Sequence, residues 1–140
     1  MDLRNWVRSF AHRKLRKAAR YSNVEHFGTK FEIPTRPQES LIGVYTNSPG
    51  SLIEAIGITD CGLHINSETK WRWVAYEEIR AAHLPVTLKD APFESEFLDI
   101  ELRSDEILRL PIRGHSGEQG QFSDVYCFEG FLAGISRRMR

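Results

Sequence analysis

The sequence has little of what marks several classes of protein. Only two cysteines occur in 140 residues, Cys61 and Cys127, and they are too few and too far apart for a disulfide framework. No apolar run approaches the roughly 20 residues that a helix needs to cross a bilayer. The first residues also lack the apolar stretch of a secretory signal, because charges interrupt them every few positions. We therefore expect one reduced, cytoplasmic domain of ordinary size.

Motifs for catalysis and for metal or cofactor binding are missing as well. There is no Gly-x-Ser-x-Gly elbow, and the five histidines show no spacing or cysteine neighbours that would suit zinc. The glycine-rich stretch 114–120 precedes an expected helix but lacks the Lys of a phosphate loop, so we interpret it as a connecting loop. The sequence predicts a protein that is not an enzyme, with no cofactor and no metal site.

The formal net charge of zero hides an uneven distribution along the chain. Residues 1–20 contain seven basic side chains and Asp2 as their one acid, a formal charge of +6. Residues 21–136 have a formal charge of −9, and residues 137–140 add +3. A basic arm on an acidic body indicates either an anionic partner or docking of the arm on the body itself.

The basic arm has the period of an amphipathic helix over residues 2–20. Its apolar stripe consists of Leu3, Val7, Phe10, Ala11, Leu15 and Ala18. The candidate partner-binding residues are Trp6, at the boundary of the stripe, and Arg13, Arg16, Lys17 and Arg20, which gather on the opposite face. Three interpretations stay open: the stripe docks on this domain or on a partner subunit, the helix lies on an anionic membrane, or it binds nucleic acid. The acidic body makes nucleic acid the least favoured of these.

Beyond an irregular linker at residues 23–38, the hydrophobic period changes from 3.6 to 2, which is typical of strands. The pattern predicts six to seven short antiparallel strands. They cover 41–46, 52–59, 62–67, 70–76, part of 77–88, 97–103 and 106–113. Tight turns are expected at 47–50, at 60–62 with Gly62 at positive φ, and at 104–105. Trp71 and Trp73 share one strand face, and we expect core packing of both; an exposed aromatic platform for a peptide is the alternative.

The chain closes with a second amphipathic helix that begins near Ser123, a favourable N-cap residue. Val125, Phe128, Leu132, Ile135 and Met139 follow at alternating spacings of three and four, which forms one apolar stripe. Strands followed by one such helix define an α+β chain that is mostly β.

Residues 39–139 resemble bacterial pleckstrin-homology-like (PH-like) and GRAM-like domains. The resemblance depends on a strand that ends in Thr59, Asp60 and Gly62, followed by a hairpin and by Tyr76 and Ile79. It implies a strongly bent antiparallel sheet, or partly open barrel, closed by the C-terminal helix. Lipid-binding members carry basic residues in the first inter-strand loop, whereas residues 47–50 contain none. The resemblance therefore argues against phosphoinositide binding through that loop.

These observations divide the chain into a basic amphipathic helix at 1–22, the linker at 23–38 and a PH-like domain at 39–140. They predict a non-catalytic protein-interaction or adaptor module, with a protein partner or self-association through the N-terminal helix. The alternative is a peripheral membrane-binding module that uses this helix on anionic lipid.

Overall fold

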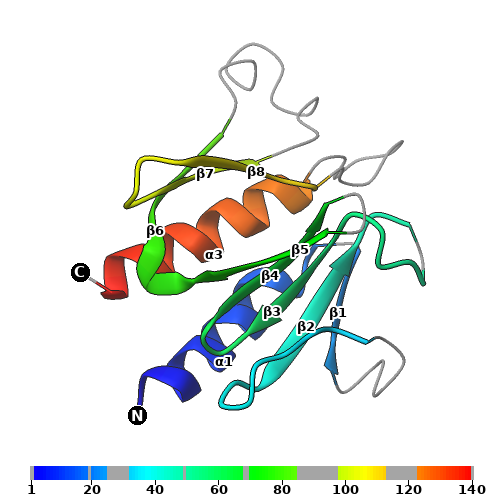
Figure 1. Cartoon of the computed structure of the whole chain (residues 1–140). Coiled ribbons are helices and arrows are strands. Elements are labelled where there is room, and N and C mark those ends of the chain that lie inside the picture. The colour runs from blue at the N-terminus through cyan, green and yellow to red at the C-terminus, as the bar shows by residue number, and fades with distance from the viewer. Residues whose placement is uncertain are drawn as a thin grey trace.

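The computed structural model in Figure 1 contains two helices and two antiparallel sheets, an α+β architecture that is mostly β. It describes residues 2–18, 20–24, 32–48, 50–67, 70–84, 98–112 and 123–139. The glycine-rich stretch 114–120 and the second half of the strand expected in 77–88 lie outside these residues.

The first sheet has five strands in the order of the sequence. They are β1 (Tyr21–Asn23), β2 (Leu41–Thr46), β3 (Ala55–Thr59), β4 (Gly62–Ser67) and β5 (Lys70–Ala75). Every neighbouring pair is antiparallel, and β4 and β5 pair in register from Gly62 opposite Ala75 to Ser67 opposite Lys70. β3 and almost all of β4 are buried, as the central strands of a covered sheet should be.

A 3-10 turn, η1 (Tyr76–Glu78), leads from β5 into the second sheet. This sheet contains β6 (Ile79–His83), β7 (Leu98–Leu102) and β8 (Ile107–Leu110), again in sequence order. β7 alternates as expected, because Leu98, Ile100 and Leu102 are buried and the two acidic residues between them are not.

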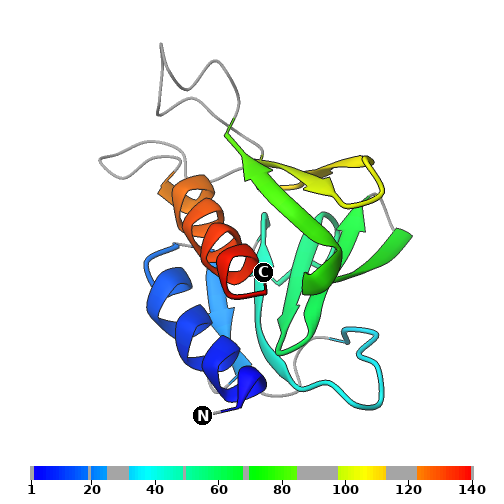
Figure 2. The ribbon, with the colours of Figure 1, turned by 90° about the vertical axis from the view of Figure 1, so that its left-hand side faces the viewer.

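The helices α1 (Leu3–Leu15) and α3 (Ser123–Met139) lie side by side and cover the same side of the two sheets (Figure 2). All five residues of the stripe expected for α3 are buried or packed against the core. On α1, Val7, Phe10, Ala11 and Leu15 are buried in the same core. The structure therefore shows the N-terminal helix docked on its own domain.

One close contact seats α1 on α3. The ring of Phe10 lies directly over Gly134, where an added Cβ would overlap the ring. Phe10 also stacks on Trp6, with ring centroids 4.8 Å apart, and lies 6.0 Å from the ring of Phe131. A glycine in the middle of α3 lowers the stability of the helix. Here the absence of a side chain leaves the space that the Phe10 ring occupies.

The first helix ends earlier than the predicted 2–20. It begins after Asp2, whose side chain accepts a hydrogen bond from the Asn5 backbone N–H, and ends at Leu15. The Ala18 N–H then donates to the Leu15 carbonyl in a tighter turn, and the chain enters β1, which the sequence analysis did not predict. Pairing of β1 with β2 satisfies backbone groups that a longer helix would have used, so the helical period of the side chains was misleading there.

Three expectations in the strand region are also corrected. The strand predicted at 52–59 begins at Ala55, because Glu54 has a left-handed φ of 53° and Ile53 is 62% exposed. Gly62 does not have positive φ; a side chain there would instead overlap the Val74 carbonyl and the Trp73 ring. With β1, the described residues contain eight strands rather than six or seven.

The expected packing of Trp71 and Trp73 in the core is wrong. On β5 the buried residue is Val74, and Tyr76 just after the strand is fully buried, whereas Trp71 and Trp73 are only partly buried on the other face. The alternation was identified correctly, but the larger aromatic residues were assigned to the wrong side.

We expect Gly134→Ala to lower the free energy of unfolding by roughly 1–3 kcal/mol, the usual range for an overpacked contact. Gly130→Ala on the same helix is the matched control, because a Cβ there would meet no atom within 4 Å. It should leave stability unchanged or raise it by up to about 1 kcal/mol, through helix propensity. Urea denaturation of the two variants measures the difference. Equal effects would show that Phe10 is not seated on Gly134.

Candidate functional site

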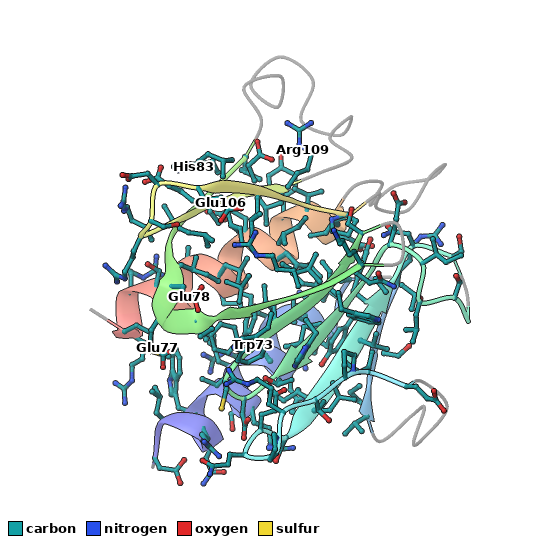
Figure 3. The ribbon with its side chains drawn as sticks, in the orientation of Figure 1. Trp73, Glu77, Glu78, His83, Glu106 and Arg109 are labelled. Atoms are coloured by element: carbon teal, nitrogen blue, oxygen red, sulfur yellow. The ribbon has the colours of Figure 1, made fainter. Side chains whose placement is uncertain are left out.

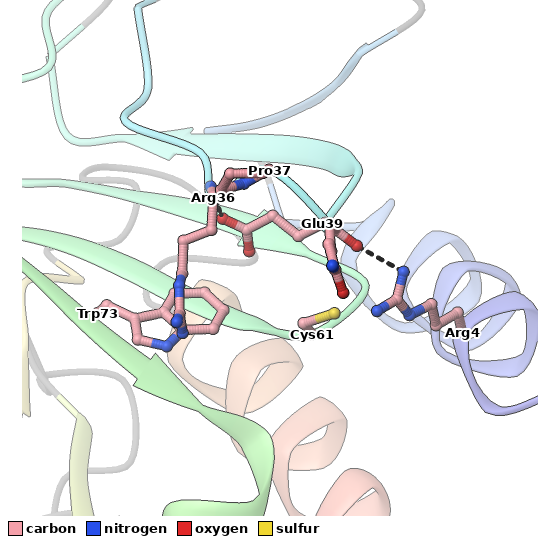
Figure 4. A pocket seen from close by; sticks show the side chains of 7 residues that line it. Arg4, Arg36, Pro37, Glu39, Cys61 and Trp73 are labelled. Carbon is pink, nitrogen blue, oxygen red and sulfur yellow. Dashed lines mark hydrogen bonds between the residues drawn. The ribbon is translucent and has the colours of Figure 1, made fainter.

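A pocket of about 470 Å³ opens where the N-terminus of α1, the segment 36–39 and the β3–β4 turn meet beside β5 (Figure 4). It is lined by Arg4, Arg36, Pro37, Gln38, Glu39, Cys61 and Trp73. Such a volume lies within the roughly 300–1,000 Å³ typical of small-molecule sites.

The wall of the pocket is fixed by the carboxylate of Glu39, whose side chain is 2% exposed. Its Oε1 accepts a hydrogen bond from the Thr59 hydroxyl at 2.7 Å. Its Oε2 accepts the backbone N–H of Arg36 and lies 2.5 Å from Nε2 of His64, which is also buried. Both carboxylate oxygens are thus engaged, so Glu39 holds the segment against β3 and β4.

Three planar side chains lie against one another beside this network. The indole of Trp73 packs at a tilt against the imidazole of His64, with an interplanar angle of 40° and centroids 4.6 Å apart. The guanidinium of Arg36 lies over the indole, 5.1 Å from its centroid. The Arg36 guanidinium makes no hydrogen bond or ion pair with the residues that the structure describes. Among those residues, its contact is with the indole of Trp73.

Arg4 and Cys61 form the other side of the pocket. Arg4 donates from Nη1 to the Gln38 carbonyl at 2.5 Å, as the dashed line in Figure 4 marks. The Cys61 thiol donates to Oδ1 of Asp60 at 3.4 Å, and the same oxygen accepts the Ser40 N–H. Partial burial, and then the Asp60 carboxylate, raise the pKa of the Cys61 thiol. The thiol is therefore kept protonated, the opposite of an activated nucleophile.

Of the residues that suggested the PH-like resemblance, Thr59 contacts Gly62 and Tyr76 at this end of the first sheet. The Thr59 hydroxyl accepts the backbone N–H groups of Cys61 and Gly62, which closes the β3–β4 turn. The Tyr76 hydroxyl donates to the Thr59 carbonyl at 2.6 Å. The motif therefore has a local structural role at the β3–β4 turn, which also carries the pocket residue Cys61.

A second candidate region is the basic surface over the seam of α1 and α3, which we call the basic seam: Arg13, Lys14 and Lys17 of the N-terminal segment and Arg138 of α3. Arg13 and Lys14 place their charges 5.2 Å and 5.7 Å from the Phe10 ring centroid. Arg138 lies 5.3 Å from the ring centroid of Trp6. The stacked Trp6–Phe10 pair thus gathers basic groups from both ends of the chain onto one surface.

The predicted partner-binding residues are only partly brought together. Arg13 and Lys17 belong to the basic seam, the Trp6 ring lies beneath Arg138 of that seam, and Arg16 is exposed just beyond the end of α1. Arg20 is different, because it turns inward and donates from Nη1 to the Asn47 carbonyl at 2.6 Å. Its assignment to the free basic face is corrected, since the helix ends before it reaches Arg20.

The pocket residues were not identified from the sequence. Arg36 and Glu39 lie in the segment interpreted as a linker and strand lead-in, and Arg4 was counted only toward the charge of the arm. His64 is buried and pairs with Glu39, a residue 25 positions away in the chain. The one signal for a buried His64 in the sequence was its place between two apolar residues, Leu63 and Ile65, on a strand that the structure shows to be covered.

The paired carboxylates on the second sheet lie on the outward face of β7 and form ion pairs there. Asp99 pairs with Arg109 across β7 and β8, and Glu101 pairs with Arg80. Hydrogen bonds from Arg80 and then from His83 lower the pKa of Glu101, and Arg72 lowers the pKa of Glu106 in the same way. Figure 3 shows His83 and Arg109 on this sheet, Glu106 in the connection between β7 and β8, and Glu77 and Glu78 at the turn that precedes the sheet.

Within the part of the chain that the structure describes, no group of three or more His, Cys, Asp or Glu residues could hold a metal ion. No helix of these residues is long and apolar enough to cross a membrane. Comparisons of the chain with family models, with curated proteins and with solved structures find no match.

We expect Glu39→Ala to destabilise the fold by about 2–5 kcal/mol, because it leaves the buried His64 and Thr59 groups without their partner. Glu32→Ala, at an exposed position of the same segment, is the control and should change stability by less than about 0.5 kcal/mol. Chemical denaturation of both variants tests this. A small effect of Glu39→Ala would show that the carboxylate does not hold the segment.

In a Cys127→Ser background, the alkylation of Cys61 by iodoacetamide should follow a pH profile displaced to higher pH than that of a free thiol. The raised pKa leaves less thiolate at any pH below it, so the reaction is slower there. Asp60→Asn removes a charge that favours the protonated form and should shift the profile back to lower pH. Asp2→Asn, on the first turn of the chain, is the control and should not move it.

Proposed function

We propose that this chain is a non-catalytic binding module of PH-like fold, a cytoplasmic protein-interaction or adaptor module, whose partner surface is the basic seam. The observation that carries the proposal is the docked N-terminal helix: its apolar side belongs to the core, and its basic side faces outward. The partner would therefore meet a rigid, positively charged surface, which suits an acidic protein surface.

The fold supports the PH-like part of this proposal. Strands β2–β8 run in sequence order through two antiparallel sheets and are followed by one amphipathic helix, as the resemblance implies. Helix α3 contacts β6, β7 and η1 and lies at the side where the two sheets diverge (Figure 2). In this proposal α3 closes a strongly bent, partly open barrel, and α1 and β1 are additions to it.

The docking of α1 favours a protein partner over a membrane. An amphipathic helix binds a bilayer by burying its apolar face below the headgroups. Here Val7, Phe10, Ala11 and Leu15 already fill the core, so insertion would require the helix to leave its own domain. The proposal also includes no chemical step, because Glu39 is fully engaged and the pKa of Cys61 is raised.

The test is a triple substitution of the basic seam, Arg13→Gln, Lys14→Gln and Lys17→Gln. We expect the unmodified protein to form cross-links to acidic partners in cell extract, and we expect the triple substitution to abolish these cross-links. The control changes the net charge equally on another side of the molecule, with Lys70→Gln, Arg72→Gln and Arg103→Gln, and should keep the cross-links. Loss of cross-links in both variants, or in neither, contradicts the proposed surface.

Flotation with neutral and phosphatidylserine-containing vesicles tests the alternative in the same variants. We expect no flotation of the unmodified protein at physiological salt. Salt-sensitive flotation that only the triple substitution of the basic seam removes would identify the chain as a peripheral membrane module instead.

A further inference from the structure

The pocket beside Trp73 presents cationic donors to its interior. The carboxylates nearby are buried and engaged: Glu39 with Thr59, His64 and the Arg36 N–H, and Asp60 with the Ser40 N–H and the Cys61 thiol. The guanidinium groups of Arg4 and Arg36, in contrast, belong to exposed residues that line the pocket. A ligand that enters the pocket therefore meets hydrogen-bond donors with positive charge.

Arg36 is held ready for such a ligand by its contact with Trp73. The guanidinium charge lies over the indole ring, 5.1 Å from its centroid, and its N–H groups donate to no residue that the structure describes. His64 packs against the indole, and the carboxylate of Glu39 is bonded both to His64 and to the backbone N–H of Arg36. The side chain and the backbone of Arg36 are thus both positioned by one buried network, and its planar donors stay available for an oxyanion.

Arg4 supplies a second set of donors on the other side of the pocket. Its Nη1 donates one hydrogen bond to the Gln38 carbonyl. A guanidinium carries five N–H groups, so further donors remain for a ligand. Figure 4 shows Cys61 between Arg36 on one side and Arg4 on the other. Two cationic forks across one pocket favour a ligand with two negative charges over one with a single charge.

We propose that this pocket binds a small organic dianion, a dicarboxylate or a phosphate monoester, between Arg36 and Arg4. The pocket volume of about 470 Å³ suits a molecule of that size. Neither arginine belongs to the basic seam, so this site and the proposed partner surface share no charged residue.

The full-length protein is titrated with succinate, inorganic phosphate and glycerol 3-phosphate, with acetate as the single-charge comparison. Calorimetry gives the Kd, and the indole N–H signals in ¹H–¹⁵N spectra give the location, after assignment with Trp73→Phe and Trp6→Phe. Binding in the pocket moves the Trp73 signal, whereas binding at the basic seam moves the signal of Trp6, which lies against Arg138. Succinate against the two phosphates distinguishes the dicarboxylate from the phosphate ligand.

Arg36→Gln and Arg4→Gln should each weaken the tighter dianion roughly tenfold or more, as expected for a lost charge-assisted contact. Arg137→Gln removes the same charge from an exposed position that does not line the pocket, and should change the Kd by less than about twofold. Unchanged dispersion of the spectra shows that each variant is folded.

Several results would overturn the inference. One is that the indole N–H signal of Trp73 does not shift with dianion at about 10 mM, or that the signal of Trp6 shifts in its place. Another is that acetate binds as tightly as succinate. A third is that the affinity for the dianion is unchanged by Arg36→Gln or by Arg4→Gln. The proposed partner surface is tested separately, through Arg13, Lys14 and Lys17.

Discussion

The ring of Phe10 on the backbone of Gly134 attaches the N-terminal helix to the rest of the fold, and both candidate sites depend on this attachment. With Phe10 seated, the apolar side of α1 completes the core under the two sheets. The same orientation turns Arg13 and Lys14 outward over the seam and brings Arg4, on the first turn of α1, to the pocket beside Cys61. A strongly basic segment thus becomes part of an acidic domain through apolar packing, since its charges stay at the surface.

The buried carboxylate of Glu39 is the second constraint, and it acts over a shorter range. It holds a segment with two prolines against Thr59 and His64. Because of these prolines, the segment could not join the sheet by regular pairing. Burying an acidic group is unfavourable unless its oxygens are hydrogen-bonded, and here both are. The result is a fixed wall on which Arg36 and Trp73 keep a defined arrangement, as a preorganised binding site requires.

The sequence allowed much of the fold to be predicted, because strand alternation and the stripe of α3 are local patterns. β2, β4 and β7 and the closing helix follow from residue spacing alone. The errors arose where a tertiary contact overrode a local preference: β1 forms by pairing with β2, and β5 buries Val74 and Tyr76 instead of its tryptophans. The pocket could not be predicted, since Arg4, Arg36 and Trp73 are far apart in the chain and are joined only by the docking of α1 and by the Glu39 network.

The arrangement of α1 also makes two modes of action incompatible with each other. Insertion of the helix into a membrane would withdraw Phe10 from Gly134 and, with the same movement, remove Arg4 from the pocket. By reciprocity of linkage, an anion held between Arg4 and Arg36 would stabilise the docked helix and oppose its release. The basic seam exists only in that docked state, because Arg138 and Trp6 come from the two helices that the contact joins. Occupancy of the pocket and of the seam would therefore favour the same conformation of the chain, and membrane insertion would compete with both.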